Sequence, residues 1–289
     1  MREPDLTDIA ATTVHRIQGT KGVILDMDGT LVLGDKASGG HVALPGAVDL
    51  IAALRAKHIP FRIFTNGSAK PPHVYAASLR RAGFVLEDAE FMTPTTVAAA
   101  WFRRKGLHRI RVLGDAEVEQ PLAAAGLEVI APDDPAEGIQ AVYSAWFKGF
   151  TFPALELACR DLWAGAALAT ASHVPFFAAA GGRAIGSSFA INAMLKAMTG
   201  KRATIVGKPS LVAFRQALKL MGLKPVDAPH VLVVGDDSAL ESRMANAAGA
   251  ISVGVATGLN PLEYWHALPD RDRPLLALQS AAELIPLLA

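Results

Sequence analysis

Residues 23–31, VILDMDGTL, place two carboxylates directly after a short apolar run. The run Val23-Ile24-Leu25 is typical of a buried strand, and Asp26 is the first residue after it. Asp28 and Gly29 follow, and an Asp-Gly pair on its own favours nothing more than a turn. The stretch becomes informative because other apolar runs of the chain also end in polar residues.

Three further apolar runs end in this way. Thr65, Asn66 and Gly67 follow the run 61–64, Gly207 and Lys208 follow the run 204–206, and Asp236 and Asp237 follow the run 231–234. Segments with helical periodicity separate the runs, and this alternation predicts an α/β fold with βαβ units and a parallel sheet. Ligands of open parallel sheets bind beyond the carboxyl ends of the strands. If the four runs are neighbouring strands, we therefore expect their polar residues to meet in one pocket.

The expected pocket would bring at least three carboxylates close together. Like charges at such distances raise each other's pKa and destabilise the fold unless a cation neutralises them. Oxygen ligands without His or Cys select Mg²⁺, which binds through one or two carboxylates, waters and substrate phosphate. Lys208, Thr65 and the backbone N–H groups around Asn66 and Gly67 would then face the phosphate oxygens. Phosphoryl transfer needs little more than an in-line nucleophile and this compensation of charge.

The spacing within residues 26–30 suggests separate roles for the two carboxylates. A carboxylate can attack phosphorus and form an aspartyl-phosphate, which divides one difficult step into two. We assign this role to Asp26, which stands at the strand end. Asp28 would protonate the leaving oxygen and later deprotonate the hydrolytic water. In the fourth run, Asp237 is as well suited to cap the helix that follows as to bind a metal.

Four stretches together resemble the sequence motifs of the haloacid dehalogenase (HAD) superfamily. They are DMDGTL at 26–31, FTNGS at 64–68, GKPS at 207–210, and GDD at 235–237 followed by Glu241. The resemblance covers about 22–258 and implies a Rossmann-like (HAD) core with a parallel sheet and an inserted α/β cap domain. The implied limits are 20–87 and 191–289 for the core and 88–190 for the cap. A large cap at this place is typical of subclass IIA, the NagD and p-nitrophenylphosphatase type.

The resemblance implies a magnesium-dependent phosphatase and a role for each matching residue. Asp26 would be the nucleophile and a metal ligand, and Asp28 the acid/base, with its backbone carbonyl on the metal. Asp236 would complete the metal ligands. Lys208 would be catalytic and would hold the phosphate together with Thr65, Asn66 and Gly67. The acid at position 28 favours a phosphatase over the dehalogenase and P-type ATPase branches, which lack it.

Three positions depart from the family pattern. Glu241 stands where the fourth motif usually ends in Asp, and Leu240 replaces a common Thr. We expect Glu241 either to support the metal site or to lie on a solvated helix face. The cap segment that often reads Thr-Asn-Pro-Asp is TASH at 170–173, so His173 is either a substrate contact or an ordinary loop histidine. The cap supplies the leaving-group contacts, so these departures leave the substrate open.

The composition argues against several other classes of protein. Lys and Arg total 28 against 27 Asp and Glu, so no basic excess indicates nucleic-acid binding. The single cysteine, Cys159, cannot form an internal disulfide. Residues 1–19 lack the apolar segment of a signal peptide, and no apolar run approaches the ~18 residues of a membrane span. We expect a cytoplasmic protein that acts on a small phosphorylated metabolite, without nucleic-acid or membrane partners. Subclass relatives are often dimers, which suggests a homodimer through the cap.

Two other functions are compatible with the same residues. A phosphotransferase or mutase would pass the phosphoryl group from the aspartate to another acceptor, but mutase relatives mostly carry a small helical cap elsewhere in the chain. A non-catalytic phosphometabolite-binding protein is suggested only by Glu241, and a binder has no use for a nucleophile. Phosphomonoester hydrolysis is therefore the preferred prediction, with a sugar phosphate, a nucleotide or a similar compound as substrate.

Overall fold

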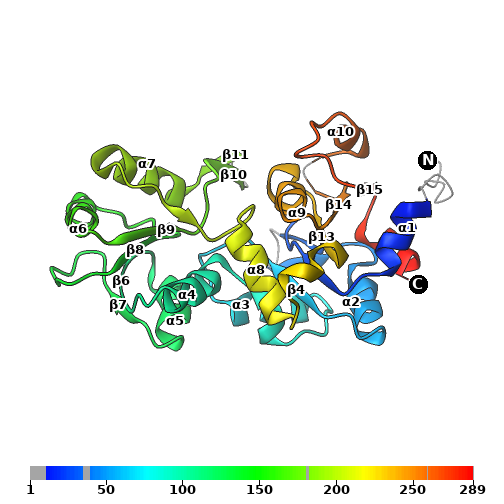
Figure 1. Ribbon diagram of the computed structural model, residues 1–289, viewed down its shortest axis with the longest axis horizontal. Coiled ribbons are helices and arrows are strands. Elements are labelled where there is room, and N and C mark those ends of the chain that lie inside the picture. Colours follow the sequence, from blue (N-terminus) through cyan, green and yellow to red (C-terminus); the bar gives the residue numbers. More distant parts are fainter. Residues whose placement is uncertain (1–10, 35–39, 180–181, 259, 289) are drawn as a thin grey trace. The chain divides into compact units, whose positions relative to one another are not determined.

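The computed structural model describes residues 11–34, 40–179, 182–258 and 260–288. The chain divides into two compact units (Figure 1). The first unit comprises Met1–Phe64, Ala76–Phe91 and Ala217–Ala289, and the second comprises Thr65–Tyr75 and Met92–Gln216. Each unit is built on a sheet of parallel strands, which confirms the predicted α/β class.

The first unit contains a six-stranded sheet with the order β15-β14-β13-β1-β4-β5. Its strands are β1 (Gly22–Leu25), β4 (Phe61–Phe64), β5 (Phe91–Met92), β13 (Val231–Gly235), β14 (Ile251–Val255) and β15 (Leu276–Leu278). β1 pairs in parallel with β13 on one side and with β4 on the other. Every residue of β1, β13 and β14 is buried, as expected for parallel strands that are covered on both faces.

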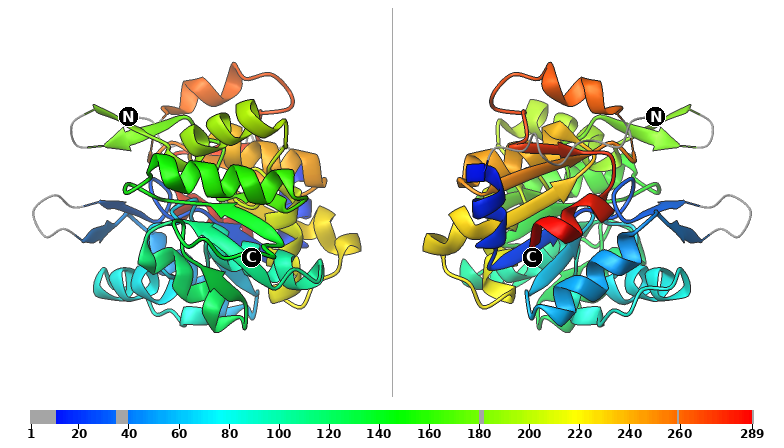
Figure 2. Two further views of the ribbon diagram at one scale, coloured as in Figure 1. Left: turned by 90° about the vertical axis from the view of Figure 1, so that its left-hand side faces the viewer. Right: turned by 90° about the vertical axis from the view of Figure 1, so that its right-hand side faces the viewer.

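Helices of the first unit cover this sheet and pack on one another. They are α1 (Ala11–Gln18), α2 (Ala47–Ala56), α9 (Arg243–Ala248), α10 (Leu262–His266), η2 (Asp88–Glu90), η3 (Pro225–His230), η4 (Ser238–Ser242) and η5 (Ala281–Leu288); α3 (Pro72–Arg81) and α8 (Leu211–Leu220) each belong partly to both units. α9 packs against β13 and β14, and α2 packs against η5. α1 and η5, from opposite ends of the described chain, also lie side by side (Figure 2). A hairpin of β2 (Val32–Gly34) and β3 (His41–Ala43) extends from the loop after β1.

The second unit contains a five-stranded parallel sheet with the order β12-β9-β8-β6-β7. The strands are β6 (Arg109–Leu113), β7 (Glu128–Ile130), β8 (Ala141–Ser144), β9 (Ala167–Thr170) and β12 (Thr204–Ile205). Helices α6 (Phe152–Trp163) and α7 (Ser187–Thr199) cover one face, and α4 (Pro94–Arg104) and α5 (Ala116–Ala124) cover the other (Figure 1). Cys159 of α6 is buried in the core of this unit. The antiparallel pair β10 (Phe176–Ala179) and β11 (Gly182–Ile185) forms a separate hairpin.

One of the four apolar runs lies in the other sheet. The condition that all four runs are neighbouring strands is not met, because β12 pairs with β9 in the sheet of the second unit. An apolar run predicts burial, and its pattern does not identify the strand with which it pairs. Three of the four runs therefore belong to one sheet, and the fourth belongs to the other. The predicted insertion limits of the cap, 88–190, stay a prediction.

None of the helices in the described ranges is both long enough and apolar enough to span a membrane. The cytoplasmic location and the absence of nucleic-acid and membrane partners remain predictions, and so does a homodimer through the cap.

Candidate functional site

Asp26 and Asp236 follow adjacent strands of the first unit. Leu25 of β1 is paired with Val234 of β13, so both acidic residues come just after the paired segment. The Asp26 backbone N–H donates to the Val234 carbonyl at 2.9 Å, which continues the ladder by one bond. Both side chains are buried, with 8% of Asp26 and 6% of Asp236 exposed. The structure therefore brings these two predicted residues together, as the strand-end argument expected.

Two glycines leave space for the Asp236 carboxylate. A Cβ atom at Gly29 or at Gly258 would overlap Asp236 Oδ2, so this oxygen lies against the backbone of both residues. Gly29 also has a φ of +82°, a conformation that side-chain-bearing residues rarely adopt. Thr257 fixes the same turn, because its hydroxyl donates to the Gly29 carbonyl at 2.6 Å. Thr257 and Gly258 were not predicted as site residues, although they end the apolar run of β14.

The Asp28 side chain is exposed and lies beside His41. Its side chain is 58% exposed, and its Oδ1 lies 3.6 Å from His41 Nε2. Within the described ranges, no three His, Cys, Asp or Glu side chains gather in a way that could hold a metal ion. The meeting of three carboxylates in one pocket stays a prediction. The chain leaves strand geometry after Leu25 and turns back, with the Leu31 N–H bonded to the Met27 carbonyl. In this turn, a spacing of two residues does not by itself place both carboxylates on one side.

The carboxylates of Asp26 and Asp236 fit a magnesium site. Mg²⁺ is usually held by one or two protein carboxylates and keeps several waters, so a third side-chain ligand is not required. Asp26 and Asp236 supply two buried carboxylates at adjacent strand ends, and the glycines beside Asp236 keep bulky side chains away from it. Asp28 would contribute only its backbone carbonyl in the predicted arrangement, so the outward direction of its side chain does not conflict with that role.

Glu241 supports the loop that carries Asp236. Its side chain is only 2% exposed, so the expectation of a solvated helix face is wrong. Glu241 Oε2 accepts the Asp237 N–H at 3.1 Å, and a Cβ atom at Gly235 would overlap the Glu241 side chain. Asp237 Oδ1 accepts the Ala239 N–H at 2.8 Å, which is the helix-capping role foreseen for it. The longer acidic side chain at 241 thus braces the turn after β13.

The predicted phosphate-binding residues lie in the second unit and are joined by Asn66. The Lys208 N–H donates to Asn66 Oδ1 at 2.7 Å, and Asn66 Nδ2 donates to the Lys208 carbonyl at 3.1 Å. Gly207 makes room for this contact, because a Cβ atom there would come within 2.6 Å of Asn66 Oδ1. Thr65 Oγ1 accepts the Gly67 N–H at 3.0 Å. Both polar atoms of the Asn66 amide therefore bond to the backbone of Lys208. Asn66 would contact phosphate through its own backbone.

We expect replacement of Asn66 by Ala to weaken the binding of inorganic phosphate about tenfold, the equivalent of one or two lost hydrogen bonds. Without the amide, the backbone of Lys208 loses both of its bonds to Asn66. Isothermal titration with phosphate measures the change. In a Lys208→Ala background the Asn66→Ala change should have little further effect, because its influence passes through Lys208.

Asn192→Ala is the matched control for this experiment. Asn192 is also buried in the second unit, and its Oδ1 accepts a hydrogen bond from Ser144 at 3.1 Å. We expect this variant to bind phosphate normally. An equal loss of phosphate binding in the Asn192 and Asn66 variants would show a general loss of structure and would contradict the specific role of Asn66.

His173 and the aromatic residues of the second unit take up different positions. The exposed His173 ring lies against Phe189, with 4.9 Å between ring centroids, and its role in substrate binding stays a prediction. Phe147 and Phe150 pack against the core of the second unit, whereas Phe152 is 71% exposed.

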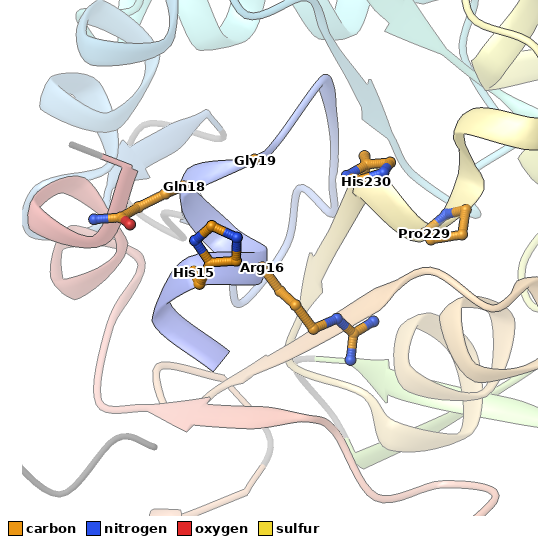
Figure 3. A pocket seen from close by; sticks show the side chains of 6 residues that line it. All are labelled: His15, Arg16, Gln18, Gly19, Pro229 and His230. Carbon is orange, nitrogen blue, oxygen red and sulfur yellow. The ribbon is translucent and has the colours of Figure 1, made fainter. Parts of the chain in front are cut away.

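A pocket of the first unit lies at the opposite end of its strands (Figure 3). It is lined by His15, Arg16, Gln18, Gly19, Pro229 and His230. Gly19 comes before β1 and His230 directly before β13, whereas Asp26 and Asp236 follow those strands. None of the described residues that line it is a carboxylate, so this pocket does not match the predicted metal site.

Comparisons with known proteins agree with the motifs. A model of haloacid dehalogenase-like hydrolases matches residues 23–128, and a model of HAD-hydrolase-like proteins matches 205–280, together well over half of the chain. The bovine phospholysine phosphohistidine inorganic pyrophosphate phosphatase (Bos taurus) is 27% identical over 94% of this chain and 96% of its own length.

Solved structures show the same fold. The 4-nitrophenylphosphatase of Thermotoga maritima is 25% identical, with a TM-score of 0.82 over 95% of this chain and 100% of its own. The glycerol phosphate phosphatase of Mycobacterium tuberculosis, solved in complex with magnesium, is 23% identical, with a TM-score of 0.78 over 93% of this chain and 77% of its own.

Proposed function

We propose a function for this chain, which belongs to the haloacid dehalogenase-like hydrolases and is a phosphatase of that family. It hydrolyses a small phosphomonoester with the help of magnesium. The observation that carries the proposal is the pair of buried carboxylates, Asp26 and Asp236, at the ends of adjacent strands, with Asp28 two residues after the first. A sugar phosphate, a nucleotide or a similar small phosphometabolite is the proposed class of substrate.

In the first proposed step, an oxygen of the Asp26 carboxylate attacks phosphorus. The bond between phosphorus and the leaving oxygen breaks, Asp28 gives its proton to that oxygen, and an aspartyl-phosphate forms on Asp26. Thr30 helps to hold the nucleophile, because its hydroxyl donates to Asp26 Oδ2 at 3.3 Å. This contact helps to fix the rotation of the Asp26 side chain.

In the second step, a water molecule attacks the aspartyl-phosphate. Asp28, now ionised, takes a proton from the water, and the bond between phosphorus and the Asp26 oxygen breaks. Inorganic phosphate leaves, and both aspartates return to their starting protonation states. Because Asp28 serves as acid and then as base, its exposed side chain suits it to exchange a proton with both the leaving group and the water.

Lys208 and Thr65 are proposed to bind the phosphoryl oxygens. The two hydrogen bonds to Asn66 fix the Lys208 backbone, so the ammonium group starts from a defined position. Asp26, the Asp28 carbonyl and Asp236 would hold Mg²⁺, which when bound offsets the negative charge of the phosphate and of the carboxylates.

The competing functions predict different results in one assay. The wild-type protein should release p-nitrophenol from p-nitrophenyl phosphate with added magnesium, and EDTA should abolish the release. A phosphotransferase would give more phosphorylated alcohol than inorganic phosphate when an alcohol acceptor is added. A non-catalytic binder would give no turnover. Glu241, the only hint of a binder, now has a bracing role in the turn after β13 that does not require loss of catalysis.

Replacing Asp236 by Asn is expected to raise the magnesium concentration needed for half-maximal activity at least about tenfold. Changes to partners that only orient metal ligands already cost 10- to 100-fold in affinity, and Asp236 is proposed to bind the ion itself. A magnesium titration of p-nitrophenyl phosphate hydrolysis measures the shift.

Asp237→Asn is the control, since Asn keeps the oxygen that accepts the Ala239 N–H. It removes a neighbouring negative charge from the same turn and should leave the magnesium dependence almost unchanged. Similar shifts in both variants would indicate a general charge effect and would contradict a ligand role for Asp236.

A further inference from the structure

His41 lies between Asp28 and Ser78 in the first unit. Its Nε2 atom is 3.6 Å from Asp28 Oδ1, and its Nδ1 atom is 2.8 Å from Ser78 Oγ. The three residues come from three segments: the turn after β1, strand β3 and helix α3. Ser78 is buried and His41 is 18% exposed on its side chain, so the histidine joins a fixed hydroxyl to the exposed carboxylate.

Backbone hydrogen bonds tie the hairpin of His41 to the turn of Asp28. The Gly29 N–H donates to the Val32 carbonyl at 2.8 Å, and the Val32 N–H donates to the Met27 carbonyl at 3.1 Å. His41 is paired with Gly34 across the hairpin. The distance between the imidazole and the carboxylate is therefore set by the fold, and it does not depend on side-chain rotation alone.

The hydrogen bond between His41 and Ser78 allows the His41 ring to present an N–H donor to Asp28. When the Ser78 hydroxyl donates to Nδ1, the neutral ring carries its hydrogen on Nε2, the atom nearest to Asp28 Oδ1. A distance of 3.6 Å is long for a hydrogen bond, but contacts at catalytic sites often tighten when the substrate binds. A bond from Nε2 to Oδ1 would leave Oδ2 of Asp28 to carry the proton.

We propose that His41 is a positioning residue, which turns the Asp28 carboxylate so that its free oxygen reaches the leaving group. The proposal rests on the proposed function, in which Asp28 gives a proton to the leaving oxygen in the first step. Ser78 in turn fixes the orientation of the His41 ring. Neither residue touches the substrate in this arrangement, and neither was singled out by the sequence motifs.

A positioning role predicts an effect that depends on the leaving group. The p-nitrophenolate anion is a good leaving group and needs little protonation, whereas an alkoxide leaves only when it is protonated. Loss of His41 should therefore impair hydrolysis of an alkyl phosphate much more than hydrolysis of p-nitrophenyl phosphate. A purely structural role for His41 would impair both reactions by the same factor.

The test compares kcat/KM for glycerol 2-phosphate and for p-nitrophenyl phosphate in the full chain with magnesium. We expect His41→Ala to lower the ratio of the two values about tenfold, a fraction of the 10²- to 10⁴-fold that general acid catalysis contributes. His41→Gln, which keeps an N–H donor, should restore part of the ratio. Ser78→Ala should lower the ratio less than His41→Ala, since the ring stays in place.

Two controls complete the experiment. Val42→Ala changes the next residue of β3, which is 58% exposed and points to the other side of the strand, and it should leave the ratio unchanged. In an Asp28→Asn background, His41→Ala should not change the ratio further. An unchanged ratio in His41→Ala, or an equal change in Val42→Ala, would overturn the positioning role of His41. Activity of the wild-type protein in the same assay would still support the phosphatase function. A wild-type protein without turnover of either ester would overturn the proposed function itself.

Discussion

Replacing Asp26 by Asn is expected to lower kcat for p-nitrophenyl phosphate by at least about 10⁴-fold, a loss typical of removing a covalent nucleophile. The amide has nearly the same shape as the carboxylate, and its oxygen can still accept the Thr30 hydrogen bond. It is too weak a nucleophile to attack phosphorus. The fold should therefore survive while the reaction stops, and kcat with saturating magnesium measures the effect.

Trapping of the phosphorylated enzyme tests whether Asp26→Asn loses activity because the nucleophile is missing. Asp28→Asn should still accept the phosphoryl group from p-nitrophenyl phosphate, because that leaving group needs little protonation, but it should release phosphate slowly. Mass spectrometry after acid quenching should then find the phosphoryl group on the peptide that contains Asp26. The Asp26→Asn variant should carry none. Equal turnover of wild type and Asp26→Asn would refute the covalent mechanism.

Replacing Arg111 by Met is expected to lower the free energy of unfolding by about 3–5 kcal/mol, the usual cost of breaking a buried ion pair. Arg111 is fully buried in the second unit, and its Nε donates to Asp161 Oδ2 at 2.5 Å. Its other nitrogens donate to backbone carbonyls of the segment 131–136, including Ala131 at 2.9 Å and Asp134 at 2.6 Å. The substitution leaves Asp161 without this cation and releases that segment, and urea denaturation of the full chain measures the loss.

A neighbouring arginine provides the control. Arg109 lies on the same strand and pairs with Glu128 at 3.4 Å, but both side chains are partly exposed, so Arg109→Met should cost at most about 1 kcal/mol. A double replacement, Arg111→Met with Asp161→Leu, should be less destabilised than Arg111→Met alone, because no buried charge remains. If Arg111→Met lowered the free energy of unfolding only as little as the Arg109 variant, the proposed contribution of this ion pair to stability would be contradicted.

The sequence alone was sufficient to predict the structural features that depend on residues close together in the chain. The apolar run before Asp26 predicted a buried strand, and β1 is buried at every residue. The run before Asp236 predicted a second strand with its acidic residue at the same sheet edge, and the pairing of Leu25 with Val234 places it there. Asp237 at the start of a helix was recognisable as a cap from its position alone.

Other features depended on residues far apart in the chain. β12 looks like the other apolar runs, yet it joins the second sheet beside β9, because strand pairing is decided by the packing of the whole unit. Asn66 and Lys208 are separated by 142 positions, so no local pattern could show that the amide of one binds the backbone of the other. The contacts of Arg111 with Asp161 and with residues 131–136 are of the same kind.

The sequence by itself determined the class of fold, the family, and the placement of Asp26 and Asp236 at strand ends, because strand periodicity and short motifs are local properties. Only the tertiary structure decided that the Asp28 side chain points outward to His41, that Glu241 is buried, and that Asn66 holds Lys208. The direction of a side chain after a turn, and the partner it meets there, are set by packing between distant segments. Residue type and spacing along the chain do not contain that information.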